Sequence, residues 1–96
     1  MMPRMTGLES AQLSDHARAA LGRRLITEDQ VRDVLRAPEK VVAGNRPGRK
    51  VAQGAVTLGD PPLRVLLRVV VDLTRNPPEV VTAYATTQFR RYGAAG

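Results

Sequence analysis

The sequence lacks cysteine, has only two tyrosines and one phenylalanine as aromatic residues, and contains no long apolar run. The absence of cysteine excludes disulfides, thiolate zinc sites and cysteine nucleophiles. It also fits a reducing cytoplasm, where we expect the protein to reside. The longest apolar stretch runs from Val65 to Val71, is interrupted by Arg68, and is far shorter than the roughly 20 residues that span a bilayer.

A chain of 96 residues has room for one domain with one core. Residues 1–12 carry charged side chains and no apolar block, so we expect a flexible N-terminal tail and no secretory signal. We expect a single α+β domain over residues 13–92. Residues 93–96 are expected to form a short flexible C-terminal tail.

The net charge of +6 is unevenly distributed along the chain. Residues 1–45 carry seven basic and six acidic side chains, whereas residues 46–96 carry eight basic and three acidic ones. A basic second half favours a polyanion such as RNA, or an acidic protein, as the partner. The alternative is a solvated basic surface that binds nothing.

Two short helices are predicted before residue 38. Ser14 is a suitable N-cap for a helix that runs to about Arg23. Thr27 and Gln30 form a capping box for a second helix, and Pro38 prevents its continuation. The apolar side chains expected to face the core are Ala17, Ala20 and Leu21 in the first helix and Val31, Val34 and Leu35 in the second.

Beyond Pro38 the apolar period changes from helical to alternating, which predicts strands. Pro47 and Gly48 suit the central positions of a type II turn between the first two strands. The four predicted strands are 40–43, 49–56, 63–73 and 80–86. Short loops between consecutive strands indicate an antiparallel meander. We therefore expect an α+β fold with two short N-terminal helices packed on one face of a four-stranded antiparallel sheet.

The strand 63–73 places apolar residues at every odd position and Arg68 among the even ones. Because side chains alternate between the faces of a strand, Arg68 should lie on the face away from the helices. In the next strand, Val81, Ala83 and Ala85 should pack beneath the helices. The side chains expected to gather beside Arg68 on the other face are Thr82, Tyr84 and Thr86. The alternative is a cross-strand ladder without a ligand.

His16 is the only histidine, and it lies at the start of the first predicted helix. The positive end of the helix dipole favours the neutral imidazole, which can act as a general base. The alternative is a surface histidine without a function. One histidine and no cysteine provide no metal-ligand set, and we expect neither a metal nor another cofactor.

Several short motifs occur in an order that resembles a known family. These are Ser14-x-His16-Ala17, Arg24 eight residues after the histidine, the capped second helix, Gly48-Arg49-Lys50, Leu67-Arg68-Val69-Val70-Val71 and Val81-Thr82-Ala83-Tyr84-x-Thr86. The order resembles the bacterial domain-of-unknown-function 4258 family, over about residues 13–92. That family is similar to BrnT-type and RelE-type toxins of the barnase–EndoU–colicin–RelE ribonuclease group.

The resemblance implies a toxin-like, metal-independent endoribonuclease, often paired with a cognate antitoxin protein. In such enzymes the ribose 2′-hydroxyl attacks the adjacent phosphate and leaves a 2′,3′-cyclic phosphate. This chemistry needs a base, an acid and cations that stabilise the developing charge on the phosphorane.

Matched to this sequence, His16 would be the base or acid, and Arg68 would hold the phosphate. Tyr84 would donate a proton or stack on a base, while Thr86 and Arg24 would support phosphate placement. The residues expected to guide the RNA backbone electrostatically are Arg46, Arg49, Lys50, Arg90 and Arg91.

Two positions depart from the family pattern. Ala20 and Leu25 stand where relatives often carry arginine and glycine, respectively. A non-catalytic binding module for RNA, or for an acidic antitoxin-like protein, is therefore the alternative function. A free edge strand would also allow pairing with a second copy of the chain as a homodimer.

Overall fold

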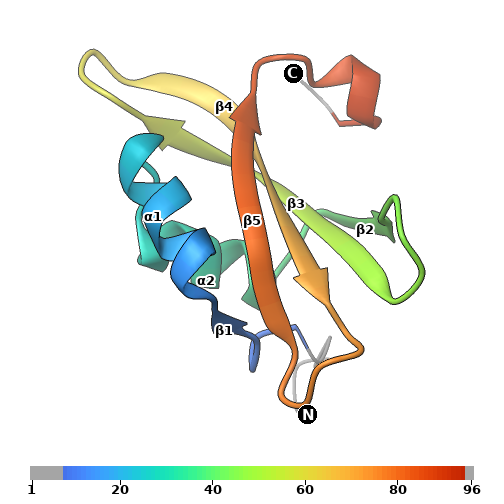
Figure 1. Cartoon of the computed structure of the whole chain (residues 1–96). Helices are drawn as coiled ribbons and strands as arrows, with labels where there is room; N and C mark the ends of the chain where they lie inside the picture. Colours follow the sequence, from blue (N-terminus) through green and yellow to red (C-terminus); the bar gives the residue numbers. More distant parts are fainter. Residues whose placement is uncertain (1–7, 95–96) are drawn as a thin grey trace, which may run out of the picture.

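The computed structural model describes residues 8–94, which form two α-helices and a five-stranded mixed sheet (Figure 1). The elements in chain order are β1 Gln12–Leu13, α1 Asp15–Arg23, α2 Glu28–Arg36, β2 Lys40–Ala43, β3 Arg49–Leu58, β4 Leu63–Asp72, β5 Glu79–Thr86 and the short 3-10 helix η1 Arg90–Tyr92. The strands are ordered β1-β5-β4-β3-β2 across the sheet. The α+β class and the two helices ahead of the predicted strands are confirmed.

The prediction of four strands missed β1, which pairs in parallel with the start of β5. The expected tail over residues 1–12 is therefore wrong for residues 8–12, where Leu8 and Ala11 are buried in the core. Such a short segment carries too little periodicity to indicate a strand. At the other end, the N–H of Ala94 donates to the carbonyl of Phe89 at 2.9 Å, so residues 93–94 continue the ordered chain. Residues 1–7 and 95–96 lie outside the described part.

Both helix starts follow the predicted capping. The hydroxyl of Ser14 accepts the N–H of Ala17 at 3.0 Å. Thr27 and Gln30 form the reciprocal capping box, with bonds of 3.0 and 3.1 Å. The predicted apolar stripes of both helices are buried, and Figure 1 shows the helices on one side of the sheet.

The helix-facing side of the sheet forms the core. The odd positions of β4 from Val65 to Val71 are buried, as the alternation predicts, whereas Leu63 and Leu73 are exposed because they lie at the ends of the predicted strand. In β5, however, Val80 is buried in place of Val81. A register shift makes Val71 pair with Val80 and leaves Val81 as the extra residue of a bulge.

The link between α1 and α2 contains a leucine with a left-handed backbone. Leu25 has φ 59°, and its side chain is 74% exposed. The N–H of Ile26 donates to the carbonyl of Leu21 at 3.1 Å, which is the long hydrogen bond of a Schellman helix end. Glycine usually occupies this position because it has no β-carbon to oppose positive φ.

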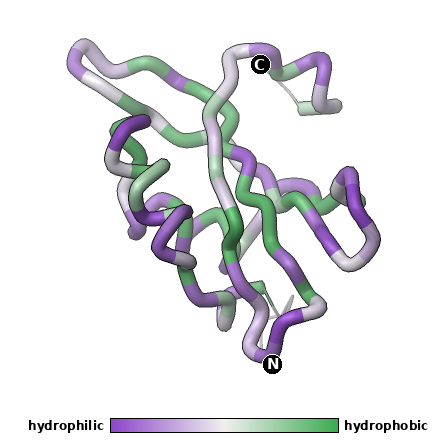
Figure 2. The backbone as a smooth tube through the Cα atoms, in the orientation of Figure 1, coloured by the Kyte–Doolittle hydropathy of each residue, from purple (hydrophilic) through white to green (hydrophobic). Residues whose placement is uncertain are grey.

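The opposite side of the sheet is partly covered by residues 87–94, which we call the C-terminal segment. Phe89 in this segment is buried, and the guanidinium carbon of Arg64 lies 5.0 Å from the centre of its ring. Figure 2 shows hydrophobic colouring along much of the central strands and hydrophilic colouring in the turn between β4 and β5. Neither helix within residues 8–94 has the length and apolarity required to cross a membrane.

Candidate anion-binding site

Arg68 occupies the middle of β4, on the face opposite the helices. The register places Gln53 of β3 on one side of it and Tyr84 of β5 on the other. Arg68 is only 9% exposed and Gln53 only 1%. The central row of this face therefore consists of a buried guanidinium between an amide and a phenol.

Within residues 8–94, the hydrogen bonds and ring contacts of the Arg68 guanidinium are with neutral groups. Its Nε donates to Oε1 of Gln53 at 3.0 Å, and one terminal nitrogen donates to the hydroxyl of Tyr84. The ring of Tyr92 lies across the guanidinium, with its centre 3.9 Å from Cζ. No carboxylate among residues 8–94 forms an ion pair with Arg68.

The unpaired charge of Arg68 is accessible to a ligand because Arg68 lines a groove. The groove has a volume of about 490 Å³, and its lining residues are Ala43, Gly44, Asn45, Arg49, Val51, Arg68, Val70, Thr82 and Tyr84. No fully buried side-chain nitrogen or oxygen in the described residues lacks a hydrogen-bond partner. The second terminal nitrogen of Arg68 forms no hydrogen bond with residues 8–94 and therefore retains contact with solvent.

This arrangement favours an anion in the groove. Burial of a charge is costly unless an opposite charge or several hydrogen bonds compensate it. A guanidinium has five N–H donors, and only two are used by Gln53 and Tyr84. The remaining donors suit phosphate oxygens, which accept the paired hydrogen bonds of a guanidinium.

Arg49 adds a second cation to the groove, near the carboxylate of Asp72. The hydroxyl of Thr74 donates to Asp72 at 2.6 Å and holds the pKa of that carboxyl below its ordinary value, and the N–H of Thr74 adds to the effect. The nearby guanidinium groups of Arg49 and Arg75 lower the same pKa further. Asp72 thus offsets positive charge at one end of the groove and leaves Arg68 uncompensated at the other.

His16 does not lie in this groove. Its side chain is exposed on α1, whose buried residues pack on the core side of the sheet, so the sheet separates the imidazole from Arg68. The reason is the apolar face of α1, because Ala17, Ala20 and Leu21 pack this helix against the core side of the sheet. A shared site for imidazole and guanidinium, expected from the family resemblance, is absent.

Arg24 and Thr86 have structural contacts instead. A terminal nitrogen of Arg24 donates to the carbonyl of Ala83 at 2.6 Å and contacts the hydroxyl of Thr82 at 3.3 Å. Arg24 therefore ties the end of α1 to β5. The hydroxyl of Thr86 accepts the N–H of Gln88 at 3.0 Å and stabilises the start of the C-terminal segment.

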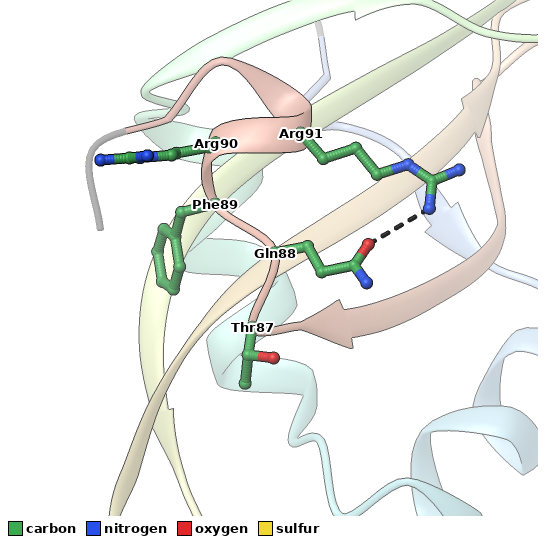
Figure 3. A pocket seen from close by; sticks show the side chains of 5 residues that line it. All are labelled: Thr87, Gln88, Phe89, Arg90 and Arg91. Atoms are coloured by element: carbon green, nitrogen blue, oxygen red, sulfur yellow. Dashed lines mark hydrogen bonds between the residues drawn. The ribbon is translucent and has the colours of Figure 1, made fainter.

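The basic residues expected to guide RNA are distributed over several surfaces. Arg49 lines the groove, but Lys50, the next residue of β3, points to the helix side, and Arg46 is exposed in the turn after β2. Arg90 and Arg91 line a second hollow of about 580 Å³ beside the C-terminal segment. Figure 3 shows these two side chains pointing in opposite directions, with Arg91 bonded to Gln88.

Sequence reasoning found Arg68, Thr82 and Tyr84 but missed Gln53 and Tyr92. The hairpin register was a usable signal for Gln53, because Leu58 pairs with Leu63 and the same register places Gln53 opposite Arg68. Tyr92 gave no comparable signal, since its contact depends on how the chain turns back after β5.

Comparison with known proteins does not assign the chain to a family. No family model matches the chain, and neither a curated protein nor a solved structure matches it. The family resemblance of the short motifs therefore stays a prediction.

Proposed function

We propose that this protein binds single-stranded RNA through the groove that contains Arg68. The observation that carries the proposal is a largely buried guanidinium with neutral partners only, open to a groove on its remaining side. A backbone phosphate would compensate that charge, and Arg49 would contact a neighbouring part of the strand.

The groove is also suited to the rest of a nucleotide. Val51 and Val70 pair across β3 and β4 and provide an apolar floor between the two arginines. Asn45 and Thr82 supply hydrogen-bonding groups at its sides. An unpaired base can lie on such a floor, whereas a base within a duplex remains stacked and paired.

Fluorescence anisotropy with a labelled single-stranded RNA tests this function. The Arg68→Met protein should bind about 10- to 100-fold more weakly than wild type, the loss expected for hydrogen bonds to a charged group. Arg49→Met, at the more accessible end of the groove, should weaken binding by a smaller factor. Arg75→Met is the control, since Arg75 does not line the groove and contacts Asp72 at 3.9 Å. Equal affinity in all four proteins would reject the proposal.

RNA cleavage is the second candidate, and it rests on Tyr84. Its hydroxyl accepts a hydrogen bond from Arg68, so its own proton remains available for the oxygen that leaves the phosphate. The 2′-hydroxyl would form the new bond to phosphorus while the bond to the 5′-oxygen breaks. The lining residues include no histidine or carboxylate to take the 2′-hydroxyl proton, and we therefore place binding ahead of cleavage.

The two candidates differ in their products. Incubation of RNA with the pure protein in excess chelator should leave the RNA intact if the protein only binds. Ends with 2′,3′-cyclic phosphate that disappear in Arg68→Met and Tyr84→Phe would favour cleavage.

A further inference from the structure

Gln53 lies next to the groove and is more buried than Arg68. It contacts both Arg68 and the C-terminal segment. Its Oε1 accepts the N–H of Arg68 at 3.0 Å. Its Nε2 donates to the carbonyl of Tyr92 at 2.8 Å. One amide therefore fixes both the guanidinium and the C-terminal segment that lies over it.

The chemistry of the amide has a consequence for the charge of the site. A carboxylate at the same place would accept the same hydrogen bond from Arg68 and would also cancel its charge. An amide holds the guanidinium in one orientation and leaves the charge unchanged. Tyr84 and the ring of Tyr92 are neutral as well, so Gln53 completes a neutral shell around Arg68.

We infer that Gln53 is a positioning residue that orients Arg68 and keeps its charge available to a phosphate in the groove. The inference extends the proposed function, because it names the residue that tunes the same site. Tyr92 assists by restricting the guanidinium from one side. Position 53 thereby determines whether the groove binds an anion, because an amide there leaves the charge of Arg68 uncompensated and a carboxylate would not.

Two substitutions separate the two roles of Gln53. Gln53→Glu keeps an acceptor for Arg68 but adds a negative charge. Gln53→Met removes the acceptor and adds no charge. Both lose the amide donor to Tyr92, so this loss is common to the two variants, which differ in the acceptor for Arg68 and in the charge. Ala19→Glu, on the exposed side of α1, makes the same change in net charge away from the groove.

The experiment follows the Arg68 Nε–H resonance by NMR in the full chain, with inorganic phosphate as the probe. Wild type and Ala19→Glu should show a distinct signal that moves on addition of phosphate. Gln53→Glu should keep the distinct signal and lose about 10-fold or more in phosphate affinity. Gln53→Met should lose the distinct signal and retain phosphate affinity within about 3-fold.

Four results would overturn the inference: no phosphate response in wild type, equal phosphate affinity in wild type and Gln53→Glu, an unchanged Arg68 signal in Gln53→Met, or a Gln53→Glu protein that does not fold. A parallel titration with labelled single-stranded RNA keeps the proposed function separate. A phosphate response without RNA binding supports the role of Gln53 and rejects RNA as the ligand.

Discussion

At the scale of the residue, Leu25 is the clearest conflict between side chain and backbone. A left-handed backbone brings the β-carbon of an L-residue close to a carbonyl oxygen, at a cost of about 1–2 kcal/mol. Because the side chain is exposed, its loss removes little packing. Leu25→Gly should therefore raise the free energy of unfolding by about 1 kcal/mol in urea denaturation.

Leu25→Ala is the matched control, since alanine shortens the side chain but retains the β-carbon. It should show no comparable gain. Equal stabilisation by alanine and glycine would attribute the effect to the exposed side chain and contradict an origin in the backbone.

Asp72 supplies a prediction on pH. Its pKa is lowered in the folded protein, so the ionised carboxylate contributes stability above the ordinary pKa of 3.8, and this contribution is lost as the pH falls through the folded value. Asp72→Ala should thus have a lower free energy of unfolding than wild type near neutral pH, and the difference should shrink below about pH 4. Urea denaturation across this pH range measures both free energies.

The Asp72→Asn protein separates charge from hydrogen bonding, because the amide oxygen still accepts from Thr74. The difference in the free energy of unfolding between Asp72→Ala and Asp72→Asn should depend little on pH. If the difference between wild type and Asp72→Ala stays constant down to about pH 3, ionisation of Asp72 does not contribute to stability.

The residues of the site were partly predictable from the sequence. Alternation along one strand is a local property, and it correctly placed Arg68, Thr82 and Tyr84 on one face. His16 could not be placed in the same way, because its distance from Arg68 depends on which side of the sheet the helices cover. Tyr92 depends on a chain reversal that leaves no periodic signal.

At the scale of the element, the connection between α1 and β5 depends on Arg24. Within residues 8–94, β5 has no neighbouring strand on its outer side beyond Val80, since β1 pairs only with Glu79 and Val80. Arg24 occupies that edge by donating to the carbonyl of Ala83. We expect Arg24→Ala to lower the free energy of unfolding by about 1.5–3 kcal/mol.

The neighbouring Arg23→Ala provides the comparison, because Arg23 is exposed in the last turn of the same helix. Its effect should stay within about 0.5 kcal/mol. Similar losses from the two substitutions in urea denaturation would mean that the edge contact of Arg24 does not stabilise the fold.

The elements themselves followed local signals where those signals were strong. The capping box at Thr27 fixed the start of α2, and alternation placed the start of β3 at Arg49. The failures have a common cause. The two-residue strand β1 and the bulge at Val81 arise from pairing with distant residues, and neither is encoded in a local period.

At the scale of the whole molecule, the two faces of the sheet have different roles. The helices bury one face and form the core, and the other face carries Arg68 and the groove. The C-terminal segment covers part of that second face and brings Tyr92 onto Arg68. Of the eight basic residues in the second half of the sequence, Arg49 and Arg68 line the groove.

The most direct measurement is an experimental structure of the protein with a short single-stranded RNA. The account predicts a backbone phosphate within hydrogen-bond distance of the Arg68 guanidinium, with Gln53 and Tyr92 still in contact with Arg68. An RNA that binds on the helix side of the sheet, with Arg68 untouched, would contradict it.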